Sequence, residues 1–128
     1  MYSVGLFYYM TKKPTEALSY FRQSEERIAA LGSHPVVKEL YYYKGLAHVE
    51  AGETEEAKRT FGAGLRYMQE GKDWRKMCAA LDHLATIEQK AGNVDVARKL
   101  LTDAVQFAQQ GDLREERKEL RKKLDALT

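Results

Sequence analysis

Apolar residues recur every three or four positions along most of the chain, which is the spacing of one helix face and not the alternation of a strand. The clearest stretch runs from Glu39 to Leu65, where two such patterns meet at Gly52. Glycines and prolines fall mostly between the patterned segments. The pattern predicts helices over residues 1–10, 14–31, 35–51, 53–69, 73–91, 93–110 and 112–127.

Residues with strong preferences for helix ends mark several of these boundaries. Pro14 and Pro35 suit the first turn of a helix, and Gly32 suits the position that follows a helix end. Asn93 and Asp112 are predicted to cap the last two helices through their side chains. The predicted helices are therefore joined by short turns.

Four sets of positions repeat at an interval of forty residues. They are Ala17, Ala57 and Ala97; Phe21, Phe61 and Leu101; Gly5, Gly45 and Ala85; and Lys12, Gly52 and Gly92. A period of this length is typical of helical hairpins that stack and bury their apolar faces against one another. The sequence therefore predicts a single all-α domain with hairpins over about residues 1–33, 34–72 and 73–111 and a capping helix over residues 112–127.

Composition excludes several classes of protein. The formal net charge of the 128 residues is only +2, so the charge balance does not indicate binding to nucleic acid or to an anionic membrane. No apolar run approaches the roughly 20 residues of a transmembrane helix. The single cysteine, Cys78, cannot form an internal disulfide, which suits a reducing compartment. We expect a cytoplasmic protein without a membrane or nucleic-acid partner.

The repeat resembles a known family. The segment Leu81-x-x-Leu84-Ala85-x-x-Glu88-x-x-x-Gly92, followed by Ala97, Leu101 and Ala104, is similar to a tetratricopeptide repeat, and residues 41–64 carry a similar pattern. The resemblance covers roughly residues 1–110. It departs from the family in the first unit, where Lys12 and Ser24 replace the usual glycine and alanine, and in its period, which exceeds the usual length of about 34 residues.

The resemblance implies a right-handed superhelix in which the first helix of each hairpin lines a concave groove. The matching groove positions are Tyr2, Leu6 and Tyr9; Tyr42, Leu46, Val49 and Glu50; and Asp82, His83, Thr86, Gln89 and Lys90. Each set recurs at intervals of three or four residues, on a stripe offset from the repeated core positions. Tyrosines suit such a groove because they offer a rigid apolar face with a polar tip.

The implied function is a non-catalytic module that binds a peptide or protein segment in this groove. An alternative is the peptide-sensing region of a bacterial transcription regulator or response-regulator phosphatase, because long-period repeats look like those of Rap- and NprR-type regulators. The family's clamp for chaperone carboxylates is not expected. The matching positions, Tyr2, Leu6, Tyr43, Ala79 and His83, lack the lysines, arginine and asparagines that it needs.

The remaining candidate residues point away from catalysis. His34, His48 and His83 are far apart in sequence and have no cysteine in a metal-ligand spacing, so no metal is expected, and His48 is interpreted as a packed side chain. Cys78 and His83 are five residues apart, which does not place them on one helix face. Without a phosphate loop or a serine elbow, neither a cofactor nor an enzymatic activity is expected.

The two ends of the chain differ in character. The last helix is charged, with a predicted ion pair between Glu119 and Lys123, and its leucines are expected to cover the last hairpin. Residues 1–10 are apolar on nearly every side, although a terminal repeat normally has a polar outer face. We therefore expect that the chain is a fragment of a larger protein or forms a homodimer through this N-terminal helix.

Overall fold

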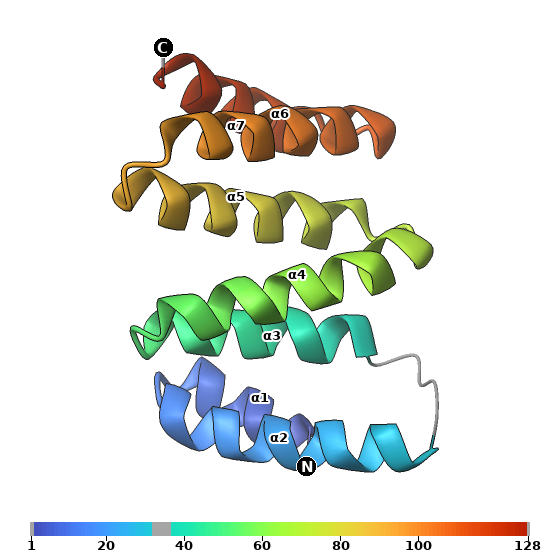
Figure 1. The fold of residues 1–128 in the computed structure, drawn as a ribbon. Helices are drawn as coiled ribbons and strands as arrows, with labels where there is room; N and C mark the ends of the chain where they lie inside the picture. The colour runs from blue at the N-terminus through green and yellow to red at the C-terminus, as the bar shows by residue number, and fades with distance from the viewer. Residues whose placement is uncertain (1, 32–36, 128) are drawn as a thin grey trace. The chain divides into compact units, whose positions relative to one another are not determined.

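The computed structural model describes residues 2–31 and 37–127, and within these residues it contains seven α-helices and no strand. The helices are α1 (Tyr2–Met10), α2 (Pro14–Leu31), α3 (Val37–Glu50), α4 (Thr54–Glu70), α5 (Trp74–Lys90), α6 (Val94–Gln110) and α7 (Arg114–Asp125) (Figure 1). The all-α prediction is confirmed, and the predicted ends that fall on described residues agree to within two residues. The end signals at Gly32 and Pro35 lie outside the described residues.

The chain divides into two compact units, residues 1–67 and residues 68–128. The first unit holds α1, α2, α3 and most of α4, and its core is formed by Ala17, Leu18, Phe21, Leu40 and Ala47. The second unit holds α5, α6 and α7. Within each unit, helices that follow one another in sequence pack as neighbours, as α1 does with α2 and α5 with α6.

The described turns share one backbone conformation. The middle residue of each has a positive φ: 63° at Lys12, 78° at Gly52, 54° at Lys72, 87° at Gly92 and 54° at Asp112. The next N–H then bonds to a carbonyl five residues earlier, as from Glu53 to His48 at 2.9 Å and from Asp73 to Met68 at 2.8 Å. This is the Schellman arrangement, which satisfies the carbonyls that a helix end leaves without partners.

This turn overturns one predicted helix cap. Asp112 takes the left-handed position of the turn, and the N-cap of α7 is Leu113, which makes no side-chain cap bond. Asn93 does stand at the N-cap of α6, but its Nδ2 donates to Glu88 Oε2 at 2.8 Å instead of its side chain capping the helix. The turn geometry explains the position of Asp112. In each described turn the left-handed residue comes one position before the N-cap, so Asp112 cannot be the N-cap itself.

The four repeated columns occupy equivalent environments. Ala17, Ala57 and Ala97 are fully buried, as are Phe21 and Phe61, and Leu101 is 3% exposed. A Cβ added to Gly5 would lie 2.7 Å from Phe21, and one added to Gly45 would lie 2.6 Å from Phe61. Three of the columns therefore mark places where paired helices come close, whereas the fourth, which contains Gly52 and Gly92, falls in the turns.

Candidate functional site

Two pockets lie between α5 and α7 in the second unit. The larger, of about 310 Å³, is lined by Arg75, Cys78, Ala79, Asp82, Glu115, Glu116, Glu119, Leu120 and Lys123. The smaller, of about 260 Å³, is lined by Asp82, Ala85, Thr86, Gln89, Leu101, Lys123 and Ala126. Asp82 and Lys123 line both, so the two pockets adjoin each other, and we call the pair the α5–α7 groove.

An ion pair stands where the two pockets meet. Lys123 Nζ donates to Asp82 Oδ2 at 2.6 Å, while the side chains of Asp82 and Lys123 are 27% and 52% exposed. Asp82 Oδ1 is buried and has no hydrogen-bond partner in the described part of the chain. One oxygen of this carboxylate is therefore paired and the other is left as an unused acceptor.

The predicted ion pair between Glu119 and Lys123 is wrong. Lys123 reaches across to Asp82 on α5, and Glu119 is 3.5 Å from Lys122 instead. The spacing of four residues along α7 was compatible with a pair within the helix. Asp82, however, is the less exposed carboxylate, and a lysine gains more from a partner that solvent screens less.

Carboxylates outnumber cations around the larger pocket. Asp82 and three glutamates of α7, at residues 115, 116 and 119, face two cations, Arg75 and Lys123. Arg75 Nε lies 3.6 Å from Glu116 Oε1, and both side chains are substantially exposed. Cys78, Ala79 and Leu120 supply the apolar part of the same lining. The pocket thus combines an apolar floor with an acidic rim.

Two titratable groups in and beside the groove, Cys78 and His83, have pKa values shifted toward their neutral forms. Burial, and after it the charges of Glu116 and Asp82, raise the pKa of the Cys78 thiol to about 11. The thiol donates to the carbonyl oxygen of Ala104 at 3.3 Å. Burial also lowers the pKa of His83, against the opposing effect of Asp82. Cys78 therefore remains a thiol near neutral pH, a poor nucleophile and metal ligand.

The structure brings together three of the residues predicted for this part of the groove. Asp82, Thr86 and Gln89 line it, whereas His83 is half-buried and Lys90 is exposed, and neither lines these two pockets. The contribution of α7 was missed entirely in the sequence. The only available signal was the forty-residue register, which makes α7 the counterpart of α5 and so places its side chains next to that helix.

The predicted groove residues of the first unit are largely engaged in packing. Tyr2, Leu6 and Tyr9 are partly buried against the core cluster. The ring of Tyr42 lies 5.2 Å from Tyr43 and 6.5 Å from buried Phe61, measured between centroids. Burial raises the pKa of Tyr9, which accords with this setting.

The other predicted positions on α3 are also partly occupied by the fold. Leu46 is 9% exposed, and Val49 is half-buried. Glu50 is exposed and pairs with Lys12, in the turn between α1 and α2, at 3.3 Å. The first unit therefore offers a row of half-buried aromatic rings at these positions.

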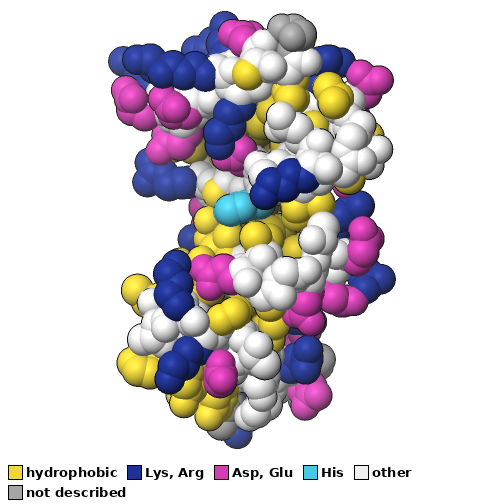
Figure 2. All heavy atoms as spheres, turned by 90° about the vertical axis from the view of Figure 1, so that its left-hand side faces the viewer, with side chains coloured by type: hydrophobic (Ala, Val, Ile, Leu, Met, Phe, Trp, Pro, Cys, Tyr) yellow, Lys and Arg dark blue, Asp and Glu magenta, His cyan; other side chains and the backbone are white. Residues whose placement is uncertain are grey.

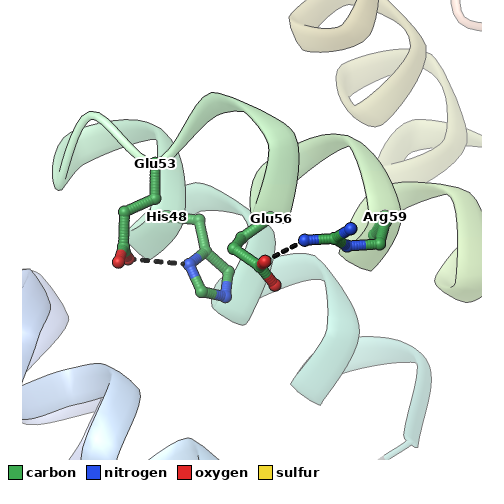
Figure 3. Close-up of polar contacts among 4 residues, drawn as sticks. All are labelled: His48, Glu53, Glu56 and Arg59. Carbon is green, nitrogen blue, oxygen red and sulfur yellow. Dashed lines mark hydrogen bonds and ion pairs between the residues drawn. The ribbon is translucent and has the colours of Figure 1, made fainter.

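His48 is a packed side chain, as predicted. It is 3% exposed, and its Nδ1 lies 3.0 Å from Glu53 Oε1, across the turn between α3 and α4 (Figure 3). Glu56 and Arg59 form a separate ion pair along α4. Among the described residues, no group of three or more histidine, cysteine or acidic side chains is arranged to hold a metal ion.

The sequence matches no protein-family model, and a search of curated proteins finds no match. None of the helices in the described residues is both long and apolar enough to cross a membrane.

Proposed function

We propose that the chain is a non-catalytic binding module of the tetratricopeptide type, which holds a peptide segment in the α5–α7 groove. Its three helical hairpins would stack in a right-handed superhelix, with α7 as the cap. The equivalent burial of residues forty positions apart supports a repeat of this kind. The observation that carries the binding role is the groove itself, where the half-used carboxylate of Asp82 adjoins an apolar floor.

The dimensions and lining of the groove suit a peptide. Its two pockets, of about 310 and 260 Å³, are each close to the lower end of the range for ligand sites, roughly 300–1,000 Å³. Such sites combine apolar surface with a few fixed polar groups that orient the ligand. Two adjoining pockets of this size match neighbouring side chains of one peptide better than a single compact metabolite.

The chemistry of the same residues supports binding without catalysis. The thiol of Cys78 is committed to the carbonyl of Ala104, and its raised pKa keeps it protonated. Asp82 is held by Lys123. Neither arrangement provides a nucleophile within reach of a base, which nucleophilic catalysis requires.

A display library of random 12-residue peptides, selected on the immobilised chain, tests this function. Peptides enriched on the wild-type chain should lose at least about tenfold in affinity for Asp82→Asn, the change expected when one charged hydrogen bond is lost. Asp103→Asn is the matched control, because Asp103 pairs with Lys99 on α6 and does not line the groove. Failure to enrich any peptide, or equal binding by both variants, would contradict the proposal.

A further inference from the structure

Helix α7 is attached to its unit through few buried groups. Leu120, which is 4% exposed, is the one buried side chain among Arg114–Asp125, all of which the structure describes. Just beyond the helix, the carbonyl oxygen of Leu127 accepts a hydrogen bond from Arg98 Nη2 at 3.1 Å. The buried residues of α6, by contrast, are Ala97, Leu101, Ala104, Val105 and Ala108. Burial of apolar surface is the dominant favourable term in folding, so α7 is anchored much less firmly than α6.

Two exposed ion pairs join α7 to α5. Lys123 Nζ lies 2.6 Å from Asp82 Oδ2, and Arg75 Nε lies 3.6 Å from Glu116 Oε1. The four side chains are between 27% and 72% exposed. Solvent screens ion pairs of this exposure, so each one contributes little to stability, and added salt weakens both of them further.

The space between α5 and α7 is incompletely filled. The two pockets, of about 310 and 260 Å³, lie where closely packed helices would interdigitate their side chains. Asp82 lines both pockets, and its Oδ1 is buried without a hydrogen-bond partner in the described part of the chain. An acceptor in this state raises the free energy of the closed arrangement, because water can satisfy it once the two helices separate.

Cys78 lies against α7 and can report on its position. It lines the larger pocket together with residues of α7, yet it is only 2% exposed. Burial raises the pKa of its thiol, and the charge of Glu116 on α7 adds to this effect. Separation of α7 would weaken both influences, so the thiol would become more accessible and more acidic. Since Cys78 is the single cysteine of the chain, its rate of alkylation measures that separation.

We propose that α7 is a lid, latched by the ion pairs of Arg75 and Lys123, which separates from α5 and α6 while these two helices stay packed together. Separation would uncover the face of α5 that carries Cys78 and Asp82, and it would widen the α5–α7 groove. An increase in ionic strength would shift the chain towards the open form, because it weakens both ion pairs. The inference goes beyond the proposed function, since it holds whether or not a peptide occupies the groove.

Two measurements on the folded chain test the lid. In hydrogen exchange followed by mass spectrometry, the slowest amides of Arg114–Asp125 should exchange at least about tenfold faster than the slowest amides of Val94–Gln110, as expected for a segment that opens locally. Under the same conditions, Cys78 should react with iodoacetamide at least about tenfold faster than global unfolding allows. Urea unfolding of the same chain sets that limit.

A double variant tests the latch. Arg75→Gln combined with Lys123→Gln removes both ion pairs and should speed alkylation of Cys78 by about two- to tenfold, in keeping with the small contribution of exposed pairs. Salt at about 0.5 M should speed alkylation of the wild-type chain, and should do so much less in the double variant. Lys99→Gln is the matched control, because Lys99 pairs with Asp103 along α6 and lines neither pocket. It should leave the rate unchanged.

The other results would overturn the inference, each for a different reason. Equal exchange in α6 and α7, with alkylation no faster than global unfolding, would show that α7 opens only when its whole unit unfolds. Fast exchange in α7 with a protected Cys78 would show that the helix frays in place and does not separate. A double variant that is alkylated at the wild-type rate would show that the two ion pairs are not the latch.

Discussion

In the first unit, the ring of a buried phenylalanine fills the space that a side chain on the facing glycine would occupy. A Cβ on Gly5 would approach Phe21 to 2.7 Å, and a Cβ on Gly45 would approach Phe61 to 2.6 Å, well inside normal contact distance. In the second unit the same two columns carry Ala85 and Leu101, and both are buried. Alanine is larger than glycine and leucine is smaller than phenylalanine. The summed side-chain volume of the two positions therefore stays similar between the units, although each residue differs.

This compensation predicts the result of a double-mutant cycle. Gly45→Ala should destabilise the chain by about 1–3 kcal/mol, because the new methyl group overpacks against Phe61. Adding Phe61→Leu should cost much less in the Gly45→Ala background than in the wild type, with a coupling of about 0.5–3 kcal/mol. Urea unfolding of the four proteins measures this coupling.

Gly62 provides the control for that cycle. It lies on α4 with open space around its Cα, so Gly62→Ala meets no steric conflict. That change should stabilise the chain by up to about 1 kcal/mol through helix propensity alone. Strictly additive costs for Gly45→Ala and Phe61→Leu would show that the two side chains do not share a volume.

At the scale of elements, the helices were predictable and their connections only partly so. Helical periodicity gave α4, α5 and α6 because each has one clear apolar face, and Gly52 and Gly92 marked left-handed turn residues. The same conformation at Lys12, Lys72 and Asp112 carries no compositional signal. These three residues are related to Gly52 and Gly92 only by lying a multiple of twenty residues away from them. Helix and turn propensities take no account of such spacing, so they could not predict these turns.

The candidate site was predictable to a similar degree. The predicted stripe of α5 positions included Asp82, Thr86 and Gln89, which line the smaller pocket. The role of α7 was not predictable, because a highly charged helix looks like a solvated surface in sequence. Whether Lys123 pairs along its own helix or with Asp82 depends on how close α5 lies, and that is a property of packing.

The shared turn makes a prediction about stability. Lys72→Gly should stabilise the chain by up to about 1 kcal/mol, because a left-handed conformation strains a residue with a Cβ more than the flexibility of glycine costs. Gln69→Gly, at an exposed position within α4, should instead destabilise it by about 0.5–1 kcal/mol. Thermal melts compare the two variants with wild type, and a lower melting temperature for Lys72→Gly would argue against strain at this turn.

At the scale of the whole molecule, large hydrophobic side chains are exposed on the outer face of α1. Val4, Phe7 and Met10 are 40%, 62% and 74% exposed. Figure 2 shows hydrophobic side chains on the surface of the unit that holds α1 and α2, among charged ones. Forty residues later, the counterparts of Val4 and Phe7 are Lys44, which pairs with Glu25 of α2 at 2.6 Å, and Ala47, which is fully buried.

On α3 this face is covered by a neighbouring helix, whereas on α1 it is exposed. We therefore predict that the chain self-associates through α1. Sedimentation velocity across a concentration series should show dimers of the wild-type chain, since exposed apolar surface of this kind favours association. Phe7→Lys combined with Met10→Lys should shift the chain to monomer without loss of helix content, because both side chains point to solvent.

Val96→Lys on α6, where the side chain is 49% exposed, is the control and should leave the dimer intact. A wild-type chain that stays monomeric at high concentration would refute this prediction, and a dimer that survives the double substitution would place the contact on another surface.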